Sequence, residues 1–424
     1  MKRLWPVVLA TSAATVAAVV LAMNFIGGEE KIEEKIERLY PAGDPQFLRS
    51  MGVLLGPAIV PGNRVEVLLN GDQIFPAMLG AIRSAQKTIT FETYIYWSEA
   101  IGKEFADALS ERARAGVKVH VLLDWVGSVK MEQAYFEEMK RGGVEVEKYH
   151  KPRWYDLARL NNRTHRKVLV VDGRVGFTGG VGIAGLWTGN AQDPDHWRDT
   201  HFRSEGPVVA QMQAVFMDNW IKATGKVLHG DGYFPALSEV GPSPAQMFRS
   251  SPSGGSESMQ LMYLLSITAA QRSIQLSSAY FVPDGLAQRA LADALKRGVK
   301  VQIITPGEHT DTETVRGASR ALWGELLEAG AQMFEYQPTM YHCKVMIVDT
   351  FLVSVGSTNF DNRSFRLNDE ANLNIYDAAF ARRQSDIFEQ DLKRSRRITL
   401  EAWRNRPFLE KIREHASSLL ATQL

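Results

Sequence analysis

The sequence contains a single cysteine, Cys343, among its 424 residues. One cysteine excludes an intrachain disulfide, so cysteine usage does not identify the compartment in which the protein works. Cys343 lies between His342 and Lys344 at the start of an apolar run that is typical of a β-strand. Because adjacent side chains of a strand point to opposite faces, the Cys343 side chain should point away from those of His342 and Lys344. We therefore expect Cys343 to be a small core residue and not a thiol nucleophile.

The sequence also lacks an excess of charge of either sign and a cluster of carboxylates with the spacing of metal ligands. It has 49 Lys and Arg residues against 48 Asp and Glu residues. Tight binding of nucleic acid through bulk charge is therefore not expected. No metal and no cofactor are predicted. At 424 residues the chain exceeds the length that one hydrophobic core usually serves, so two globular units are expected.

A long uncharged segment occupies the N-terminus. Residues 4–28 carry no charge, and as a helix they would extend roughly 37 Å, which is enough to cross a bilayer. Lys2 and Arg3 precede this segment, whereas four glutamates follow it. The positive-inside rule then predicts a single-pass anchor with the catalytic part on the non-cytoplasmic side. A cleaved secretory signal is the alternative, and it also exports the catalytic part.

The most informative pattern is a triplet of residues that occurs twice with identical spacing. The two copies are His165, Lys167, Asp172 and His342, Lys344, Asp349. A small-residue pair follows each copy, Gly179-Gly180 and Gly356-Ser357. One HxK is common on exposed strands, but two copies matched at five positions, each opening an apolar run, indicate an internal duplication that joins two half-sites.

Other segments repeat as well, and they predict the fold class. Residues 84–91 resemble 269–276, and the Gly-Val-Lys-Val of 116–119 recurs at 298–301. In the first half we expect a strand at 65–69, a turn at Asn70-Gly71, a helix at 74–85, a strand at 88–96, a helix at 102–115 and a strand at 117–123. This alternation predicts an α/β fold with an at least partly parallel sheet.

The predicted boundaries follow from composition. We expect an anchor at 1–28, a spacer and connector at 29–62 that opens with a charged helical stretch, a first domain at 63–240, a second domain at 243–397 and a helical tail at 398–424. Residues 242–258 are rich in Ser, Gly and Pro and predict the boundary between the domains. The tail is amphipathic, and we expect it to pack against the domains.

Two histidines and two lysines favour displacement at phosphorus without a metal. One imidazole can attack as nucleophile while the other protonates the leaving oxygen, and a covalent phosphohistidine divides one difficult step into two easier ones. The lysine ammonium groups can hold the non-bridging oxygens, with Asn359 and Ser357 as further donors.

Each catalytic histidine needs an acceptor that orients its other ring nitrogen. Asp199 lies 34 residues after His165, and Glu370 lies 28 residues after His342. These two carboxylates are the candidates for their respective histidines. We expect Asp172 and Asp349, which follow apolar strands, to be structural supports with the lysines as candidate partners.

The chain resembles the phospholipase D superfamily, whose HxKxxxxD motif it matches twice, and within that superfamily it is most similar to bacterial cardiolipin synthases. The resemblance covers roughly residues 65–376. It rests on the segments NRTHRK (162–167), FTGG (177–180), WRDTH (197–201), AYFVPD (279–284) and GSTNFDNRSFRLNDE (356–370).

The resemblance implies two similar α/β/α domains related by a pseudo-twofold, with one active site between them, and in this chain they follow the N-terminal transmembrane helix expected above. It implies phosphodiester exchange through a phosphohistidine, with His165 as nucleophile, His342 as general acid and Gly180 among the phosphate-binding or supporting residues. A cardiolipin synthase passes a phosphatidyl group to a hydroxyl of phosphatidylglycerol. Phosphatidylglycerol and phosphatidylethanolamine are the expected lipids, and a bacterial inner membrane is the expected location.

The chain departs from the family at one position. The family commonly has Asn seventeen residues after both histidines, and here Asn359 is present in the second half but Gly182 stands in the first. This asymmetry predicts that Asn359→Ala lowers turnover at least about tenfold, a barrier change of about 1.4 kcal/mol. It also predicts that Gly182→Asn is tolerated.

The main rival function is a phospholipase D that hydrolyses phospholipids to phosphatidic acid, because no motif reports how well the site excludes water. A nuclease is disfavoured by the anchor and by the lack of a basic stripe, and a scaffold with a dead site is disfavoured by two intact triplets.

Two aromatic pairs, Trp154-Tyr155 and Tyr280-Phe281, are candidates for an entrance for the acyl chains, with packing against the domain as the alternative. The oligomeric state stays open, since a duplicated chain completes its own site.

Overall fold

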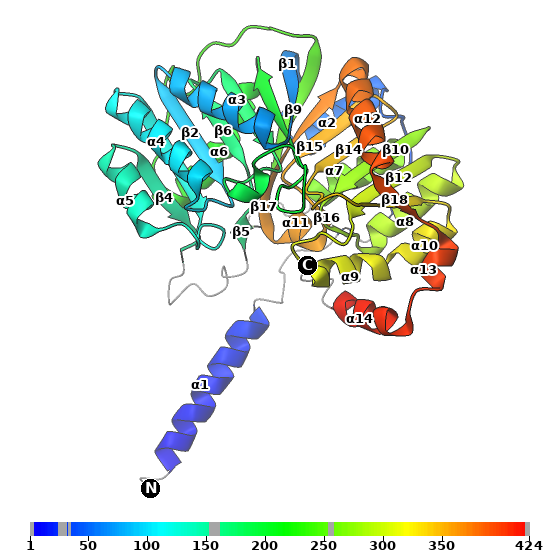
Figure 1. The fold of residues 1–424 in the computed structure, drawn as a ribbon. Coiled ribbons are helices and arrows are strands. Elements are labelled where there is room, and N and C mark those ends of the chain that lie inside the picture. The colour runs from blue at the N-terminus through cyan, green and yellow to red at the C-terminus, as the bar shows by residue number, and fades with distance from the viewer. Residues whose placement is uncertain (1–3, 24–31, 33–34, 152–161, 253–257, 420–424) are drawn as a thin grey trace.

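The computed structural model describes the chain except residues 1–3, 24–31, 33–34, 152–161, 253–257 and 420–424. Its described part forms two α/β halves that share one 16-stranded sheet (Figure 1). The expected α/β class is therefore confirmed, and the sheet is mixed, with parallel and antiparallel neighbours.

The first half follows the predicted order of strands and helices. Both predicted helices form but begin earlier, the strand expected at 88–96 ends at Thr93, and Asn70, whose φ is +56°, opens a helix. The elements are β1 (Val60–Leu69), α3 (Asn70–Ser84), β2 (Thr88–Thr93), α4 (Ala100–Arg114), β3 (Lys118–Asp124), α5 (Gln133–Arg141), β4 (Glu145–Tyr149), β5 (Arg163–Thr164), β6 (Val168–Val171), β7 (Val175–Gly179), β8 (Thr200–Glu205) and α6 (Val208–Thr224).

The second half repeats this order with additional short elements. They are β9 (Ser243–Ser250), α7 (Ser258–Ala269), β10 (Ser273–Ser278), β11 (Phe281–Val282), α8 (Gly285–Lys296), β12 (Lys300–Pro306), α9 (Glu313–Ala321), α10 (Trp323–Glu328), β13 (Gln332–Tyr336), β14 (Lys344–Val348), β15 (Leu352–Gly356), β16 (Phe360–Asp361), α11 (Asn362–Arg366), β17 (Asn368–Tyr376), α12 (Ala378–Lys393) and β18 (Ser395–Ile398). The strand β18 adds an outer edge that has no counterpart among the described residues of the first half.

The predicted duplication is present in the strand topology. From the middle outward, the order is β1-β8-β7-β6-β2-β3-β4 on one side and β9-β17-β15-β14-β10-β12-β13 on the other. The strand β2 is parallel to β3 and antiparallel to β6, and β10 has the same relation to β12 and β14. Because the equivalent central strands β1 and β9 run antiparallel, the halves are related by an approximate twofold rotation.

The segment 242–258, where the sequence predicts the boundary between the domains, contains a strand of the sheet. Residues 243–250 form β9, which pairs with both β1 and β17 and thereby joins the two halves into one sheet. Side chains alternate along β6, so that Leu169 faces the core beneath α3 and α4 while Val168 faces a core that also contains Val345 of the other half. The two halves therefore share a central core in addition to their own.

The N-terminal region contains α1 (Leu4–Met23) and α2 (Pro45–Leu54). Asp44 caps α2, and Phe47 and Met51 pack into the second half, so this connector is part of the folded body. The described residues 35–38 of the predicted helical spacer are not helical. Among the residues with a described placement, no helix is long and apolar enough to span a membrane. The membrane anchor expected at 1–28 is not confirmed.

The C-terminal tail is helical and packs against the second half, as predicted. It contains α13 (Leu400–Arg404) and α14 (Phe408–Ser418), and α14 lies beside α9 (Figure 1). Glu414 on its inner side is buried and binds the guanidinium groups of Arg320 and Arg406 at 2.7 and 2.6 Å. On its outer side, Phe408 and Leu409 are 74% and 75% exposed.

Candidate active site

Each histidine of the repeated triplet is held by a short strand pairing that crosses between the halves. The strand β5, just before His165, runs parallel to the start of β17, and the His165 amide donates to the carbonyl of Asp369 at 2.9 Å. In the equivalent place, the His342 amide donates to the carbonyl of Arg198 at 2.8 Å. The backbone of one half therefore places each histidine beside the other half.

The orienting carboxylates are exchanged between the halves, contrary to the sequence-based assignment. His165 Nδ1 lies 2.9 and 3.1 Å from the two carboxylate oxygens of Glu370, and His342 Nδ1 lies 2.7 Å from Oδ2 of Asp199. The prediction that each acid serves the histidine of its own half is wrong. It failed because the crossing strand pairs put the residue after Asp369 next to His165. Both carboxylates are fully buried.

Gly180 and Ser357, at equivalent positions, support these carboxylates. The Ser357 hydroxyl donates to Glu370, so this side chain is committed to the carboxylate, whereas we had expected a phosphate donor. At Gly180 an added Cβ would lie 2.3 Å from Oδ1 of Asp199, so glycine leaves the space that Asp199 occupies. The Trp187 indole N–H donates to Asp199 at 3.0 Å.

Burial controls the charge of the histidines. Removal from water, together with the charge of Lys167, lowers the pKa of His165 to about 4 despite the opposing effect of Glu370. Burial and then the charge of Lys344 lower the pKa of His342 to about 3. These lowered pKa values favour the neutral form of both rings near pH 7. Since each Nδ1 faces a carboxylate, Nε2 of each ring is the atom that can react with a substrate.

The two lysines lie at the centre of the site. Lys167 Nζ donates to the carbonyl of His165, and Lys344 Nζ donates to the carbonyl of His342, both at 2.7 Å. Burial lowers the pKa of Lys167 to about 7 and lowers the pKa of Lys344 as well. A bound phosphate would favour the charged form of both ammonium groups, which suits them to hold its non-bridging oxygens.

Asp172 and Asp349 are structural supports, but the lysines are not their partners. The Asp172 carboxylate accepts hydrogen bonds from the backbone amides of residues 86–88 at 2.7 to 2.9 Å. Asp349 accepts from residues 271–273 at 2.7 to 3.0 Å. Both have φ near +53°, a region that Asp tolerates. Each carboxylate therefore fixes the start of a strand, Asp172 that of β2 and Asp349 that of β10.

We expect Asp349→Ala to lower the free energy of unfolding by about 2–4 kcal/mol, since three backbone amides lose a charged acceptor. Urea unfolding of the variant and of the parent measures this change. Asp349→Asn keeps one carbonyl oxygen and should lose less. Unchanged stability with abolished turnover would instead assign Asp349 a role in the chemistry.

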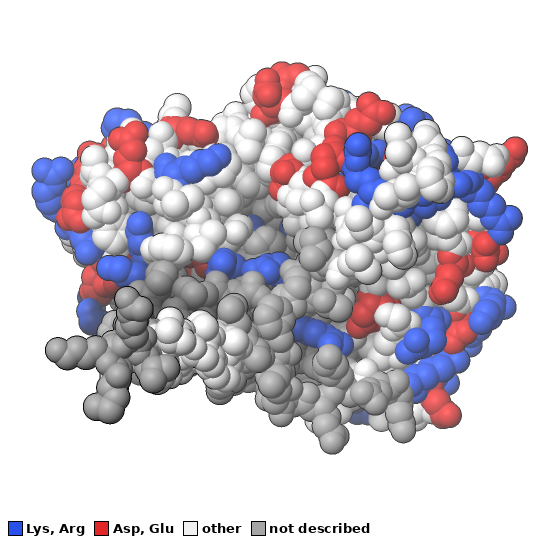
Figure 2. All heavy atoms as spheres, turned by 90° about the horizontal axis from the view of Figure 1, so that it is seen from below, with Lys and Arg blue, Asp and Glu red and all other residues white. Residues whose placement is uncertain are grey.

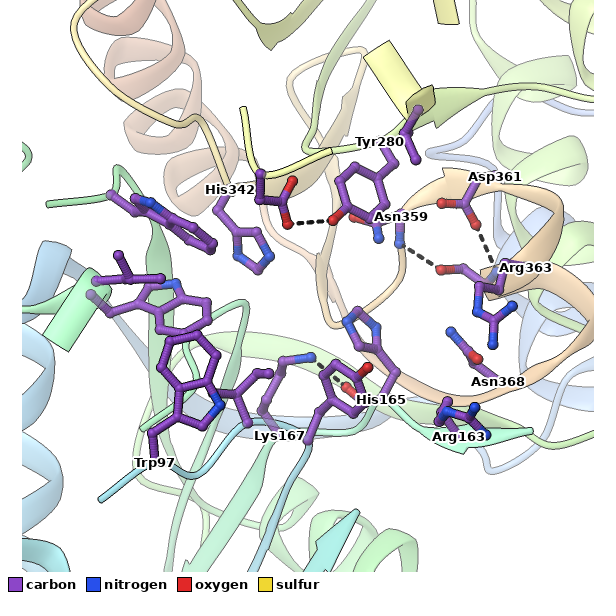
Figure 3. A pocket seen from close by; sticks show the side chains of 18 residues that line it. Trp97, Arg163, His165, Lys167, Tyr280, His342, Asn359, Asp361, Arg363 and Asn368 are labelled. Carbon is purple, nitrogen blue, oxygen red and sulfur yellow. Dashed lines mark hydrogen bonds between the residues drawn. The ribbon is translucent and has the colours of Figure 1, made fainter. Parts of the chain in front are cut away.

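A cavity of about 300 Å3 contains the histidines and has two chemically different ends (Figure 3). Arg163, Arg363 and Asn368 form the arginine end. Trp97, Trp187 and Trp197 form the tryptophan end, where both Trp187 and Trp197 lie within 5.4 Å of the His342 ring, measured between ring centroids. His165, Lys167 and His342 lie between these ends.

Asn359 lines this cavity as expected, and its buried Oδ1 has no hydrogen-bond partner among the described residues. The expectation that Gly182→Asn is tolerated is wrong. A Cβ at Gly182 would lie 2.7 Å from Cβ of Ile95 and 3.1 Å from the Trp187 ring. The position of the absent asparagine is therefore filled by apolar side chains, and a larger residue there would overpack the wall.

The other candidates divide as follows. Cys343 is buried, and burial raises its thiol pKa to about 12, which confirms a core residue. Tyr280 lines the cavity and donates to Asp311 at 2.5 Å, whereas Phe281 lies in the core and cannot line an entrance. Residues 154 and 155 lie outside the described residues. Trp97 and Arg363 also line the cavity and were not predicted from the sequence; the signal that could have identified them is that the two repeats differ at these positions.

Comparison with known proteins identifies related sequences across most of the chain. The family model described as "Cardiolipin synthase, PLD-like domain" matches residues 78–216 and 263–392. A cardiolipin synthase of Geobacillus kaustophilus is 35% identical over 393 residues, which is 92% of this chain and 78% of the relative. The major cardiolipin synthase ClsA of Bacillus subtilis is 34% identical over 362 residues, which is 85% of this chain and 75% of the relative.

A solved structure shows the same fold at low sequence identity. The phosphatidylserine synthase of Haemophilus influenzae aligns with a TM-score of 0.65 and 14% identity, covering 89% of this chain and 100% of that structure. This likeness supports the two-half architecture described above and no more than the architecture.

Proposed function

This chain belongs to the cardiolipin synthase family, and from that premise we propose that it joins two molecules of phosphatidylglycerol into cardiolipin and releases glycerol. It is a phospholipid phosphodiester transferase. The observation that carries the proposal is the pair of histidines in one cavity, each fixed at Nδ1 by a carboxylate of the other half. Such a pair suits a two-step exchange at phosphorus.

In the first step, Nε2 of His165 attacks the phosphorus of the donor lipid. A P–N bond forms, the P–O bond to the headgroup glycerol breaks, and His342 gives a proton to the leaving oxygen. The negative charge of the bound diester raises the pKa of both rings, which allows His342 to carry that proton although burial lowers its pKa. Lys167 and Lys344 stabilise the charge on the non-bridging oxygens.

In the second step, a hydroxyl of the acceptor phosphatidylglycerol attacks the phosphorus of the phosphatidyl-histidine. His342 takes the hydroxyl proton, the new P–O bond forms and the P–N bond breaks, so His165 returns to its starting state. The assignment of His165 as nucleophile follows the family, since the approximate twofold makes the two rings geometrically similar.

We also place the enzyme at a bacterial cell membrane, with the catalytic part on the non-cytoplasmic side. Trp5 and Leu9 of α1 are 69% and 63% exposed, and α1 leaves the globular body on the side where α14 presents Phe408 and Leu409 (Figure 1). Figure 2 views this side and shows Lys and Arg side chains at its centre. An apolar helix with nearby basic groups suits contact with an anionic lipid surface.

Incubation of the purified full chain in detergent micelles with phosphatidylglycerol tests the function. Mass spectrometry should detect cardiolipin and glycerol, and His165→Ala and His342→Ala serve as blanks. Added phosphatidylethanolamine tests the donor, because its use would release ethanolamine. Formation of phosphatidic acid without cardiolipin would identify a hydrolase and contradict the proposal. The names of the relatives favour the transferase over that hydrolase.

A further inference from the structure

The arginine end of the cavity breaks the internal repeat. Arg163 lies two positions before the first catalytic histidine, and the corresponding residue before the second is Met340. Arg363 lies 21 positions after the second catalytic histidine, and the corresponding residue after the first is Leu186. The catalytic side chains repeat, but both arginines are absent from the equivalent positions. The duplicated fold and its chemistry therefore do not require them.

The two arginines come from different halves and converge on one place. Arg163 lies on β5 and Arg363 on α11, and Figure 3 shows both beside Asn368, on the side of the histidines away from Trp97. Burial, and then the charge of Arg163, lower the pKa of Arg363. Two like charges that approach in a partly buried cavity repel each other, and an anion bound between them would offset this repulsion.

Asp361 and Asp124, whose charges act on Arg363, also accept hydrogen bonds from backbone amides. Asp361 caps α11 by accepting from the Ser364 amide at 2.7 Å. Asp124 accepts from the amides of residues 126 and 127 at 2.9 and 3.0 Å, and from the Thr164 amide at 3.0 Å. These carboxylates fix the loops that carry the arginines. A diester anion, with two oxygens able to accept from guanidinium groups, suits a cavity wall that carries both arginines.

An acceptor phosphatidylglycerol brings such an anion into the cavity. Its attacking hydroxyl is joined to its own phosphodiester by a three-carbon glycerol, so a hydroxyl at the central phosphorus places a second phosphate a short distance away. Lys167 and Lys344 already serve the first phosphate. On the basis of the function proposed above, we propose that Arg163 and Arg363 bind the phosphodiester of the acceptor lipid.

Asn368 completes this acceptor site. It is 7% exposed and lines the cavity, and its Oδ1 is buried without a hydrogen-bond partner among the residues of described placement. The middle hydroxyl of the acceptor glycerol can donate to this oxygen and fill its unmet capacity. Water carries neither a phosphate nor a second hydroxyl, so the site favours lipid acceptors over hydrolysis.

Competition between two acceptors tests the proposal. The full chain is incubated in micelles of phosphatidylglycerol with butanol, a neutral alcohol that has no phosphate, and mass spectrometry measures the ratio of cardiolipin to phosphatidylbutanol. Arg163→Gln and Arg363→Gln should each lower this ratio at least tenfold. Arg363→Lys, which keeps the charge, should lower it less. Lys130→Gln is the matched control, since it removes a charge that lies 3.9 Å from the Trp97 ring, and it should leave the ratio unchanged.

The outcomes separate this inference from the proposed function. A parent enzyme that forms neither cardiolipin nor phosphatidylbutanol would overturn the function and the acceptor site together. A parent enzyme that forms both products, with an unchanged ratio in both Gln variants, would overturn the acceptor site alone. A Gln variant that unfolds loses cardiolipin and phosphatidylbutanol in proportion, so its ratio of products is not informative. Arg363→Lys then tests the acceptor site, which predicts a lowered ratio of cardiolipin to phosphatidylbutanol in this folded variant as well.

Discussion

Replacement of His165 or His342 by alanine lowers cardiolipin formation by at least about 1,000-fold, because nucleophilic catalysis and proton transfer are each lost from a single site. The two losses should be similar in size. One cavity holds both rings, and no second pair of histidines in the described residues lines it. A duplicated chain with two independent sites would instead lose about half of its activity in each variant.

Initial rates of cardiolipin formation, measured with parent and variants at equal concentration, test this expectation. Cys343→Ala is the matched control because it lies between His342 and Lys344, yet its buried side chain contacts Thr200 on the other side of the strand. We expect its rate to stay within a few-fold of the parent. If either histidine variant kept a tenth of the parent rate, the single shared site would be wrong.

Glu370→Gln and Asp199→Asn each lower turnover by at least about 100-fold. An amide cannot hold the Nδ1–H tautomer as a carboxylate does, and it does not stabilise the charged ring; the loss of an equivalent carboxylate in a catalytic triad is about 10,000-fold. The negative charge of Glu370 raises the pKa of His165, so its removal lowers that pKa further and leaves the ring a weaker base.

The exchange of carboxylates between halves makes this prediction specific. Nuclear magnetic resonance of protein labelled with nitrogen-15 in its histidines reports which ring nitrogen carries the proton. Glu370→Gln should change the signal of His165 and leave that of His342 unchanged, and Asp199→Asn should do the reverse. If Asp199→Asn altered His165 instead, each acid would serve its own half and the crossed arrangement would be wrong.

Much of the fold and of the site was predictable from the repeat. The spacing of the two triplets predicted a duplication, and the strands and helices around them form close to the expected positions. Cys343 was predicted as a core residue because strand side chains alternate. Local patterns of this kind depend on a few neighbouring residues, so they can be read without knowledge of how the halves meet.

The errors arose where the two halves meet. Asp199 and Glu370 were assigned to the nearest histidine in sequence, but the pairing of β5 with β17 brings together residues about 200 positions apart. The segment of β9 has a composition typical of loops, yet it is a central strand that pairs with β1 on one side and with β17 on the other. The arginine end also needed the assembled cavity, since Arg163 and Arg363 come from different halves.

Detection of a phosphatidyl group on a histidine is the most direct test of this account. The enzyme is mixed with phosphatidylglycerol, quenched in alkali, in which the P–N bond survives, and its peptides are measured by mass spectrometry. The account predicts an adduct on the peptide of His165 in the parent enzyme and none in His165→Ala. Full cardiolipin formation with no adduct on either histidine would contradict the account, because it would show direct displacement without a covalent intermediate.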